Sequence, residues 1–383
     1  MGSIIEYVKT EMRTFTEKPF SAVDSLVLSQ IAYFKLSGLV PGLYDDEPSV
    51  PLRDLYRAEC FDLLFGKTFV PDNNLNFLTV LAASPRFRNM RLNYYVSEID
   101  TDIQMQFSAV TFFPDDGSVY IAYRGTDGTL VGWREDCNMA FTFPLPAQEA
   151  GLLYMNSVSG FIPSDTVVRT GGHSKGGNIA MYAAMKCNPS LRNRIADIYN
   201  HDGPGFISEV LITDEYASIR DRVRKTLPHS SFFGMLLHQG ENYSVVESSG
   251  ISGFLQHIPF NWVVEGGDFR YIDKVKNSSF QTQIAINEWL RSHTPEEQKH
   301  LIDTIFGLLE TTKVENFNDM NEDWLKTSLK ILSAAKDMDP ETKKFLQSTI
   351  SSFVKISLKA LSPIHGKQQA PALPPESTHT SSI

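Results

Sequence analysis

The stretch between residues 167 and 184 constrains the fold of this chain more than any other feature. It reads VVRTGGHSKGGNIAMYAA, so a β-branched run passes through four glycines and a serine into a run of good helix formers. A strand that turns abruptly into a helix needs residues without bulky side chains at the junction. We therefore predict a strand over 167–170, a helix over 178–187, and a tight bend between them that lifts the Ser174 hydroxyl toward solvent.

The flanking segments repeat this alternation of short apolar runs and helix-forming runs. Further strands are predicted at 108–113, 119–123, 195–199, 222–227 and 243–247, and a helix at 146–161. Asp115-Asp116-Gly117 is a turn sequence, so the first two of these strands are predicted to form a hairpin. Alternating strands and helices predict an α/β fold, with a mostly parallel central sheet and helices on both of its faces.

The composition and the positions of the prolines divide the chain into regions. Four are expected: a helical and irregular N-terminal region (1–100), an α/β core (101–280), a C-terminal helical extension (281–365) and a disordered, proline- and serine-rich tail (366–383). Helix starts inside the extension are marked by Thr294, which is followed by proline and two glutamates, and by Asp339, which is followed by proline.

The composition excludes several classes of function. The 383 residues are 42% hydrophobic and 21% charged, which is ordinary for a globular chain. Thirty-five basic and 45 acidic residues give 35 − 45 = −10, a balance that argues against a nucleic-acid partner because phosphate binding requires a basic surface. The three cysteines form no CxxC pair and no metal-ligand spacing, so we expect free thiols in a reducing compartment, with no metal and no cofactor.

The N-terminus does not resemble a targeting or anchoring segment. Acidic residues appear early and no long apolar run follows, unlike a secretion signal. Glu6 stands where a myristoylation motif requires serine or threonine. Because no run approaches about 18 apolar residues, no transmembrane helix is expected. We expect a cytoplasmic protein, and the sequence leaves peripheral membrane contact and the oligomeric state open.

The residues from Gly172 to Gly176 fit the pattern G-x-S-x-G. In such an elbow the serine adopts a strained backbone angle, and larger residues two positions away would collide with a neighbouring strand or helix. The helix that follows points its first amides at the same place, so the backbone N–H of Lys175 is a candidate oxyanion donor. The alternative is a phosphate-binding turn, but the spacing matches neither G-x-G-x-x-G nor G-x-x-x-x-G-K-[ST].

A second motif follows the predicted strand at 119–123. Arg124-Gly125-Thr126, with Trp133 and Asp136 downstream, resembles the class 3 lipases, whose oxyanion strand ends in a similar R-G-[ST]. More closely, the chain resembles an uncharacterised bacterial α/β-hydrolase-like family distantly related to those lipases, through RGTDGTLVGWREDCNMAF, GGHSKGGNIA, HDGPGF and LQHIPFNW. The resemblance implies an α/β-hydrolase fold, with the backbone N–H of Thr126 as the second oxyanion donor. The charged residues of the motif are expected to hold the loop by ion pairs.

A serine with its ordinary pKa needs a general base and an acid that orients the base, here in the chain order Ser, Asp or Glu, His. Among the nine histidines, His257 lies in a predicted loop after the last strand candidate and in the Q-H-x-P segment of the resembling family. Class 3 lipases carry the acid in the stretch equivalent to 227–231, which here has no carboxylate. Asp202, at the end of the preceding strand, is the preferred acid. Glu241, Glu247 and a dyad without an acid are the alternatives.

These features together predict a serine esterase or lipase-like hydrolase that cleaves a carboxylic ester, lipid esters included, through Ser174, His257, Asp202 and an acyl-enzyme. The apolar segments 139–146 and 232–237 are candidates either for an acyl pocket or for plain core. Two further readings stay open at this point. One is a catalytically silent hydrolase-fold protein that binds a ligand or partner, and the other is acyl transfer to an acceptor other than water.

Overall fold

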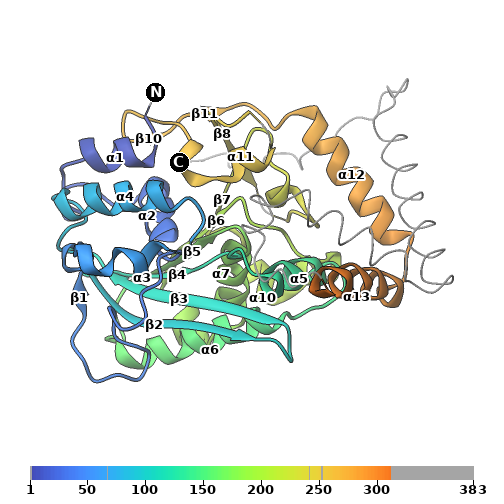
Figure 1. The fold of residues 1–383 in the computed structure, drawn as a ribbon, viewed down its shortest axis with the longest axis horizontal. Coiled ribbons are helices and arrows are strands. Elements are labelled where there is room, and N and C mark those ends of the chain that lie inside the picture. Colours follow the sequence, from blue (N-terminus) through green and yellow to red (C-terminus); the bar gives the residue numbers. More distant parts are fainter. Residues whose placement is uncertain (1, 67, 241, 252, 312–383) are drawn as a thin grey trace, which may run out of the picture.

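One mixed β-sheet organises the chain, as the computed structural model of residues 2–66, 68–240, 242–251 and 253–311 shows (Figure 1). In the described residues its nine strands lie in the order β1-β2-β3-β4-β5-β6-β7-β8-β11, and β9 and β10 form a separate pair. The strands are β1 (Val50–Pro51), β2 (Arg91–Asp100), β3 (Met105–Phe113), β4 (Val119–Tyr123), β5 (Val168–His173), β6 (Ile195–His201), β7 (Val223–Pro228), β8 (Tyr243–Val246), β9 (Val264–Glu265), β10 (Asp268–Phe269) and β11 (Tyr271–Ile272). The run from β4 to β8 is parallel, and the strands outside it pair antiparallel.

Helices connect the parallel strands and flank the sheet at both ends of the chain. They are α1 (Ile4–Thr10), α2 (Ala22–Ile31), α3 (Phe61–Phe65), α4 (Pro71–Ala83), α5 (Leu130–Asn138), α6 (Pro146–Phe161), α7 (Lys175–Lys186), α8 (Pro189–Arg192), α9 (Ser208–Leu211), α10 (Asp214–Arg220), α11 (Gly253–His257), α12 (Asn277–Arg291) and α13 (Pro295–Thr311). Short 3₁₀ turns occur at η1 (Leu52–Leu55), η2 (Ala58–Cys60), η3 (Phe233–Met235) and η4 (Pro259–Asn261).

The alternation of side chains along β4 shows how the sheet is covered. Tyr120 and Ala122 pack into the apolar cluster that contains α1, α2 and α4. Val119, Ile121 and Tyr123 point the other way, into the cluster built with α6 and α7. Successive strand residues face opposite sides of a sheet, so each face of β4 has its own core. Helices therefore cover both faces, as the alternation of sequence patterns predicted.

The register of the parallel strands brings their carboxyl ends to one edge of the sheet. His173 at the end of β5 pairs with His201 at the end of β6, so Ser174 and Asp202 follow equivalent positions on neighbouring strands. Tyr123, the last residue of β4, pairs with Gly172 on β5. In open α/β sheets, ligands bind at this edge.

Most of the predicted core elements are confirmed, including the hairpin of β3 and β4 and the bend between β5 and α7. One expectation was wrong: residues 91–100, placed in the helical N-terminal region, form β2, which pairs with β3. The register shifts between Asn93 and Val96, and Tyr94 has a φ of 59°. This irregularity breaks the period-2 pattern by which a strand is recognised in sequence.

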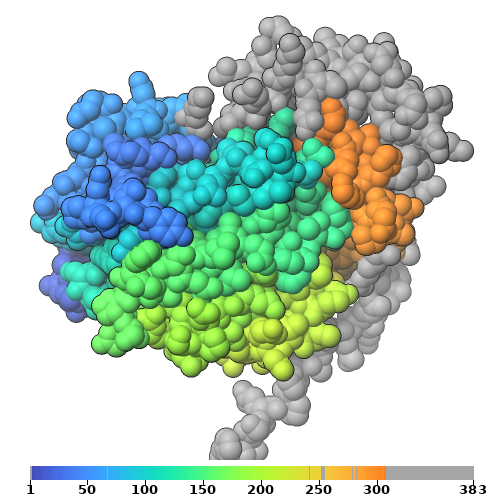
Figure 2. Space-filling model, turned by 90° about the horizontal axis from the view of Figure 1, so that it is seen from below, coloured from blue at the N-terminus to red at the C-terminus, as the bar shows by residue number. Residues whose placement is uncertain are grey.

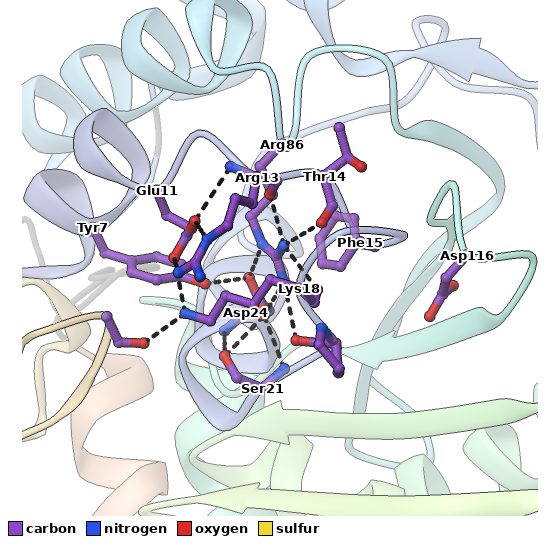
Figure 3. A network of polar contacts seen from close by, with 12 residues as sticks. Tyr7, Glu11, Arg13, Thr14, Phe15, Lys18, Ser21, Asp24, Arg86 and Asp116 are labelled. Carbon is purple, nitrogen blue, oxygen red and sulfur yellow. Dashed lines mark hydrogen bonds and ion pairs between the residues drawn. The ribbon is translucent and has the colours of Figure 1, made fainter.

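A polar cluster around Arg86 joins α2 to the loop of residues 13–18 (Figure 3). The Arg86 guanidinium forms an ion pair at 2.8 Å with Asp24 of α2, and both side chains are fully buried. Nη1 of Arg86 also donates to three main-chain carbonyls in the loop of residues 13–18. Its guanidinium lies 3.8 Å from the centre of the Phe15 ring. The Arg86 and Asp24 side chains at the centre of this cluster hold α2 against the loop of residues 13–18.

Helix α13 begins as predicted and packs beside α5. At the start of α13 the main-chain N–H of Thr294 donates to the Glu297 carboxylate, and the main-chain N–H of Glu297 donates to the Thr294 hydroxyl, which completes a capping box. Arg134 of α5 forms an ion pair at 2.6 Å with Asp303 of α13. Figure 2 shows the orange C-terminal residues against the teal-to-green segment of the chain, which contains α5. No helix within the described ranges has the length and apolar character to traverse a bilayer. The helix predicted from Asp339 and the tail over 366–383 lie outside those ranges.

Candidate active site

Ser174 occupies the strained bend that its glycine-rich surroundings predict. It lies between β5 and α7 with φ 59° and ψ −136°, and its N–H donates to the His201 carbonyl at 2.9 Å. A Cβ on Gly176 would lie 2.1 Å from the carbonyl oxygen of Tyr123, and one on Gly172 would lie 2.3 Å from the carbonyl carbon of Gly176. Glycine is therefore required at both positions, because neighbouring main-chain atoms lie too close to leave room for a Cβ.

Asp202 and His257 meet beside this bend. The His257 Nδ1 lies 2.7 Å from Asp202 Oδ2, and the Asp202 side chain is fully buried. The other carboxylate oxygen accepts hydrogen bonds from the Ser231 hydroxyl and, at 3.1 Å, from the Gly234 N–H. An ionised carboxylate is an acceptor, so Nδ1 carries the proton and Nε2 carries the lone pair of the neutral ring. This is the tautomer that a general base requires.

The alternative acids are not in this position. Glu247 forms an ion pair at 3.1 Å with Arg270, and Glu241 lies outside the described residues. The stretch over 227–231, which lacks a carboxylate, contributes Ser231 as a donor to Asp202. The structure thus brings together Ser174, His257 and Asp202 from the ends of β5, α11 and β6.

Ser174 and His257 line the same cavity, which we call the His257 cavity and which has a volume of about 270 Å³. Its walls are formed by Gln30, Tyr33, Phe69, Val70, Thr126, Asp127, Gly128, Trp133, Asp136, His173, Ser174, Phe233, His257, Ile258 and Pro259. Within the described residues, the His257 ring is hydrogen-bonded to Asp202, and no direct hydrogen bond joins it to Ser174 Oγ. Catalytic hydrogen bonds of this kind often tighten only when substrate is in place.

The loop after β4 packs directly against the bend. A Cβ on Gly125 would lie 2.6 Å from the His173 carbonyl oxygen and 2.9 Å from Ser174 Cβ. The next residue, Thr126, donates its hydroxyl to Asp136 Oδ2, which holds the loop against α5. Lys175 is the first residue of α7, where main-chain N–H groups have no acceptor within the helix. Both predicted oxyanion residues therefore lie at the bend that carries Ser174.

The Lys175 side chain is buried and runs away from solvent toward α5. Its Nζ lies 2.6 Å from Glu135 Oε2 and 3.6 Å from Asp136 Oδ1. Burial alone would lower the pKa of Lys175, but the two carboxylates outweigh it and raise that pKa. Burial raises the pKa of Asp136 to about 6. Glu135 also accepts hydrogen bonds from the main-chain N–H groups of Gln106 at 3.1 Å and Ala147 at 2.9 Å, so this ion pair ties the start of α7 to α5, β3 and the start of α6.

Arg124 has the structural role that its position suggested. Its Nη2 lies 3.2 Å from Asp127 Oδ2 inside the same loop, and Lys35 reaches that carboxylate oxygen from the N-terminal region at 3.4 Å. The two cations lower the pKa of Asp127, although burial opposes them. Ion pairs from Asp127 to Arg124 and to Lys35 therefore hold the loop that carries Thr126 in place.

A hydrogen-bond chain connects the candidate base to the N-terminal region. His173 Nε2 lies 2.7 Å from the His257 main-chain oxygen, and a carbonyl can only accept, so Nε2 carries the proton. His173 Nδ1 then accepts from the Tyr33 hydroxyl at 3.0 Å. Burial, and secondarily His257, holds the pKa of His173 well below its usual range, so the ring is neutral. Tyr33 belongs to no sequence motif, and the sequence analysis did not identify it.

A second cavity also opens on Ser174. It has a volume of about 480 Å³, and we call it the helix cavity because α12 and α13 form one wall. Its lining residues are Trp133, Asp136, Cys137, Met139, Ala140, Phe141, Ser174, Lys175, Pro204, Phe232, Phe233, Leu236, Leu237, Ile286, Trp289, Leu290, Gln298, Leu301 and Ile302. Both apolar segments singled out in the sequence, 139–146 and 232–237, contribute residues to the lining of this cavity.

No cluster suited to a metal ion occurs in the described part of the chain, counting groups of three or more His, Cys, Asp or Glu side chains. Cys60 and Cys187 are buried free thiols, and Cys137 is partly buried.

Comparison with known proteins identifies a family. The sequence profile of the family described as Mbeg1-like matches residues 81–307, more than half of the chain. This range contains Ser174, Asp202, His257 and Thr126, whereas Tyr33 lies outside it. No curated protein and no solved structure matches the chain. On the extent of the profile match, the chain belongs to the Mbeg1-like family.

Proposed function

We propose that this protein is a serine hydrolase of the esterase or lipase type, built on an α/β-hydrolase fold distantly related to the class 3 lipases. One observation carries the proposal: a strained serine and an imidazole paired with a buried carboxylate line the same cavity. Such an arrangement supplies a nucleophile, a base and a group that orients the base. We propose a cytoplasmic location, and the mechanism calls on no cofactor.

The proposed reaction has two halves. Ser174 Oγ attacks the ester carbonyl carbon as His257 Nε2 takes its proton, and the carbonyl oxygen becomes an oxyanion. The oxyanion collapses, the bond to the alcohol oxygen breaks, and His257 returns the proton to the departing alcohol. Water, deprotonated by His257, then attacks the acyl-enzyme, and the carboxylic acid leaves as the proton returns to Ser174.

The oxyanion needs donors that are in place before the charge develops. In the proposal these are the main-chain N–H groups of Lys175 and Thr126. Support comes from the contacts that immobilise both residues: the Lys175–Glu135 ion pair for the first, and the Thr126–Asp136 hydrogen bond for the second. Asp202 stays ionised and stabilises the imidazolium that forms on His257.

Labelling with a fluorophosphonate probe tests the proposal. We expect the wild type to be labelled, Ser174→Ala to be unlabelled, and His257→Asn to be labelled much more slowly. Ser208→Ala, which changes an exposed serine, serves as the matched control and should react like the wild type. Hydrolysis of p-nitrophenyl esters should follow the same order.

The outcome also decides between this proposal and a hydrolase-fold protein that only binds. Failure of the probe to label folded wild-type protein, together with failure to hydrolyse any ester, would support the binding role. Loss of free acid product when an alcohol is added would instead indicate acyl transfer as the natural reaction.

A further inference from the structure

We infer that the helix cavity holds the acyl chain of a fatty acyl ester and that the His257 cavity holds a small alcohol. The inference rests on the proposed function and assigns the two parts of the substrate to the two cavities. Four residues are shared by the walls of both cavities: Trp133, Asp136, Ser174 and Phe233. The cavities therefore meet at the serine, where the ester carbonyl would be attacked.

The position of His257 distinguishes the cavities chemically. His257 lines the smaller cavity and is absent from the lining of the larger one. In the acylation half-reaction, the proton on His257 must reach the alcohol oxygen as its bond to the acyl carbon breaks. The alcohol therefore leaves on the His257 side. The acyl chain is attached to the opposite side of the carbonyl carbon, which points it into the helix cavity.

The lining of the helix cavity matches an acyl chain. Its wall is formed mainly by apolar side chains, among them Met139, Phe141, Leu236, Ile286, Leu290 and Ile302. The buried charge at its edge, Lys175 Nζ, is directed at Glu135. An apolar chain placed here gains burial without separating any of these polar groups from their partners.

The helix cavity is also the larger of the two, at about 480 Å³ against about 270 Å³. The smaller cavity has a mixed lining, with Tyr33, Gln30 and Asp127 beside Phe69 and Ile258. Size and polarity therefore agree with the direction of proton transfer: a long apolar group on one side and a compact alcohol on the other.

One residue of α12, Ile286, should determine which acyl chain lengths the helix cavity accepts. Ile286 lines the helix cavity, whereas Ile284, two residues earlier on the same helix, is 37% exposed and does not line it. Lengthening the side chain at 286 should shorten the space for an acyl chain. A longer side chain at position 284 should extend into solvent.

A series of p-nitrophenyl esters from acetate to laurate tests the inference, because the leaving group is constant and only the acyl chain changes. We expect kcat/KM of the wild type to rise by about fourfold per methylene until the cavity is full. Ile286→Trp should lower the ratio of kcat/KM on laurate to kcat/KM on acetate by about tenfold or more, since several methylenes lose their site. Ile284→Trp should behave like the wild type.

The possible failures are distinguishable. Hydrolysis of acetate with no rise along the series, or equal effects of the two tryptophan variants, would overturn the acyl assignment and leave the proposed hydrolase function standing. Absence of hydrolysis and of fluorophosphonate labelling in the wild type would contradict the proposed function itself. If Ile286→Trp does not fold, Leu290→Phe narrows the same wall and should shift the optimum toward shorter chains.

Discussion

Asp202 and His257 lie 55 residues apart in the chain, and their side chains meet at 2.7 Å between Oδ2 and Nδ1. Asp202 is held in a positive-φ conformation at the end of β6, and its second oxygen is occupied by Ser231 and Gly234. The carboxylate therefore has one oxygen left for the imidazole. This geometry allows His257 a single orientation and a single tautomer.

Replacement of Asp202 by asparagine should lower kcat by about 10⁴, because the amide no longer selects the tautomer with the proton on Nδ1. The measurement is kcat for a p-nitrophenyl ester, with folding checked by circular dichroism. Glu247→Gln is the matched control, since Glu247 pairs with Arg270 instead. Wild-type turnover in Asp202→Asn would exclude Asp202 as the acid that orients the base.

Removal of the Tyr33 hydroxyl should lower kcat by about tenfold with little change in KM. The hydroxyl donates to His173 Nδ1, and its loss leaves a buried acceptor unpaired, at a cost of about 1–3 kcal/mol. His173 could then turn and release the His257 carbonyl. Steady-state kinetics of Tyr33→Phe check the split between kcat and KM. Tyr44→Phe, at a residue 78% exposed, is the control, and equal kinetics in the two variants would contradict a positioning role.

Gly176→Ala should destabilise the protein by about 3 kcal/mol or more, because the new methyl would lie 2.1 Å from the Tyr123 carbonyl oxygen. Gly160→Ala is a control of the same type, since a Cβ there meets nothing within 4 Å. In α6 that change should be neutral or stabilise by up to about 1 kcal/mol. Urea unfolding measures both. Similar free energies of unfolding for the two variants would show that the strand–helix junction is looser than described.

Lys175→Met should cost about 3–5 kcal/mol of unfolding free energy, because it leaves the Glu135 carboxylate buried without its cation. The double variant Lys175→Met/Glu135→Gln should be more stable than the single variant, since the uncompensated charge is gone. A double-mutant cycle by urea unfolding measures this coupling. Additive effects of the two substitutions would mean that the ion pair does not link α7 to α5 energetically.

The stability of the fold should fall as the pH falls below about 6.5, with His201 as one cause. Burial lowers the pKa of His201 to about 3, and its ring nitrogens lie against the hydroxyls of Thr226 and Ser25. The unfolded chain binds a proton at higher pH than the folded protein does. The stabilisation is therefore complete above the unfolded pKa and decreases as the pH drops toward the folded pKa.

Between about pH 7.5 and pH 5 this histidine should account for a loss of about 2 kcal/mol. Urea unfolding at the two pH values measures the loss, and His201→Gln should reduce it by that amount. An identical pH dependence in the variant would show that folding does not lower the pKa of His201.

The local features of the chain were readable from the sequence because they depend on neighbouring residues. The junction of β5 and α7 requires small residues at fixed spacing around Ser174, and the capping box at Thr294 uses residues three apart. The candidates Asp202 and His257 came from their places after predicted strands and from a family resemblance. Their contact at 2.7 Å confirms that the two side chains are neighbours.

Tertiary packing decided what no local pattern contains. The strand β2 is concealed by an irregularity at Tyr94, and its place in the sheet follows from pairing with β3. Tyr33 reaches His173 across 140 residues because α2 is bound to the sheet through buried Ser25, whose hydroxyl lies 2.7 Å from the Tyr120 hydroxyl and 2.9 Å from His201 Nε2.

The division between a His257 cavity and a helix cavity likewise depends on where α12 and α13 pack. By itself, the sequence determined the elbow and most of the core strands and helices, which are set by short-range sterics and periodicity, and it supplied the candidate residues through their places after predicted strands and a family resemblance. Only the tertiary structure determined which distant side chains share a cavity, because those contacts depend on how whole elements bury their apolar faces against one another.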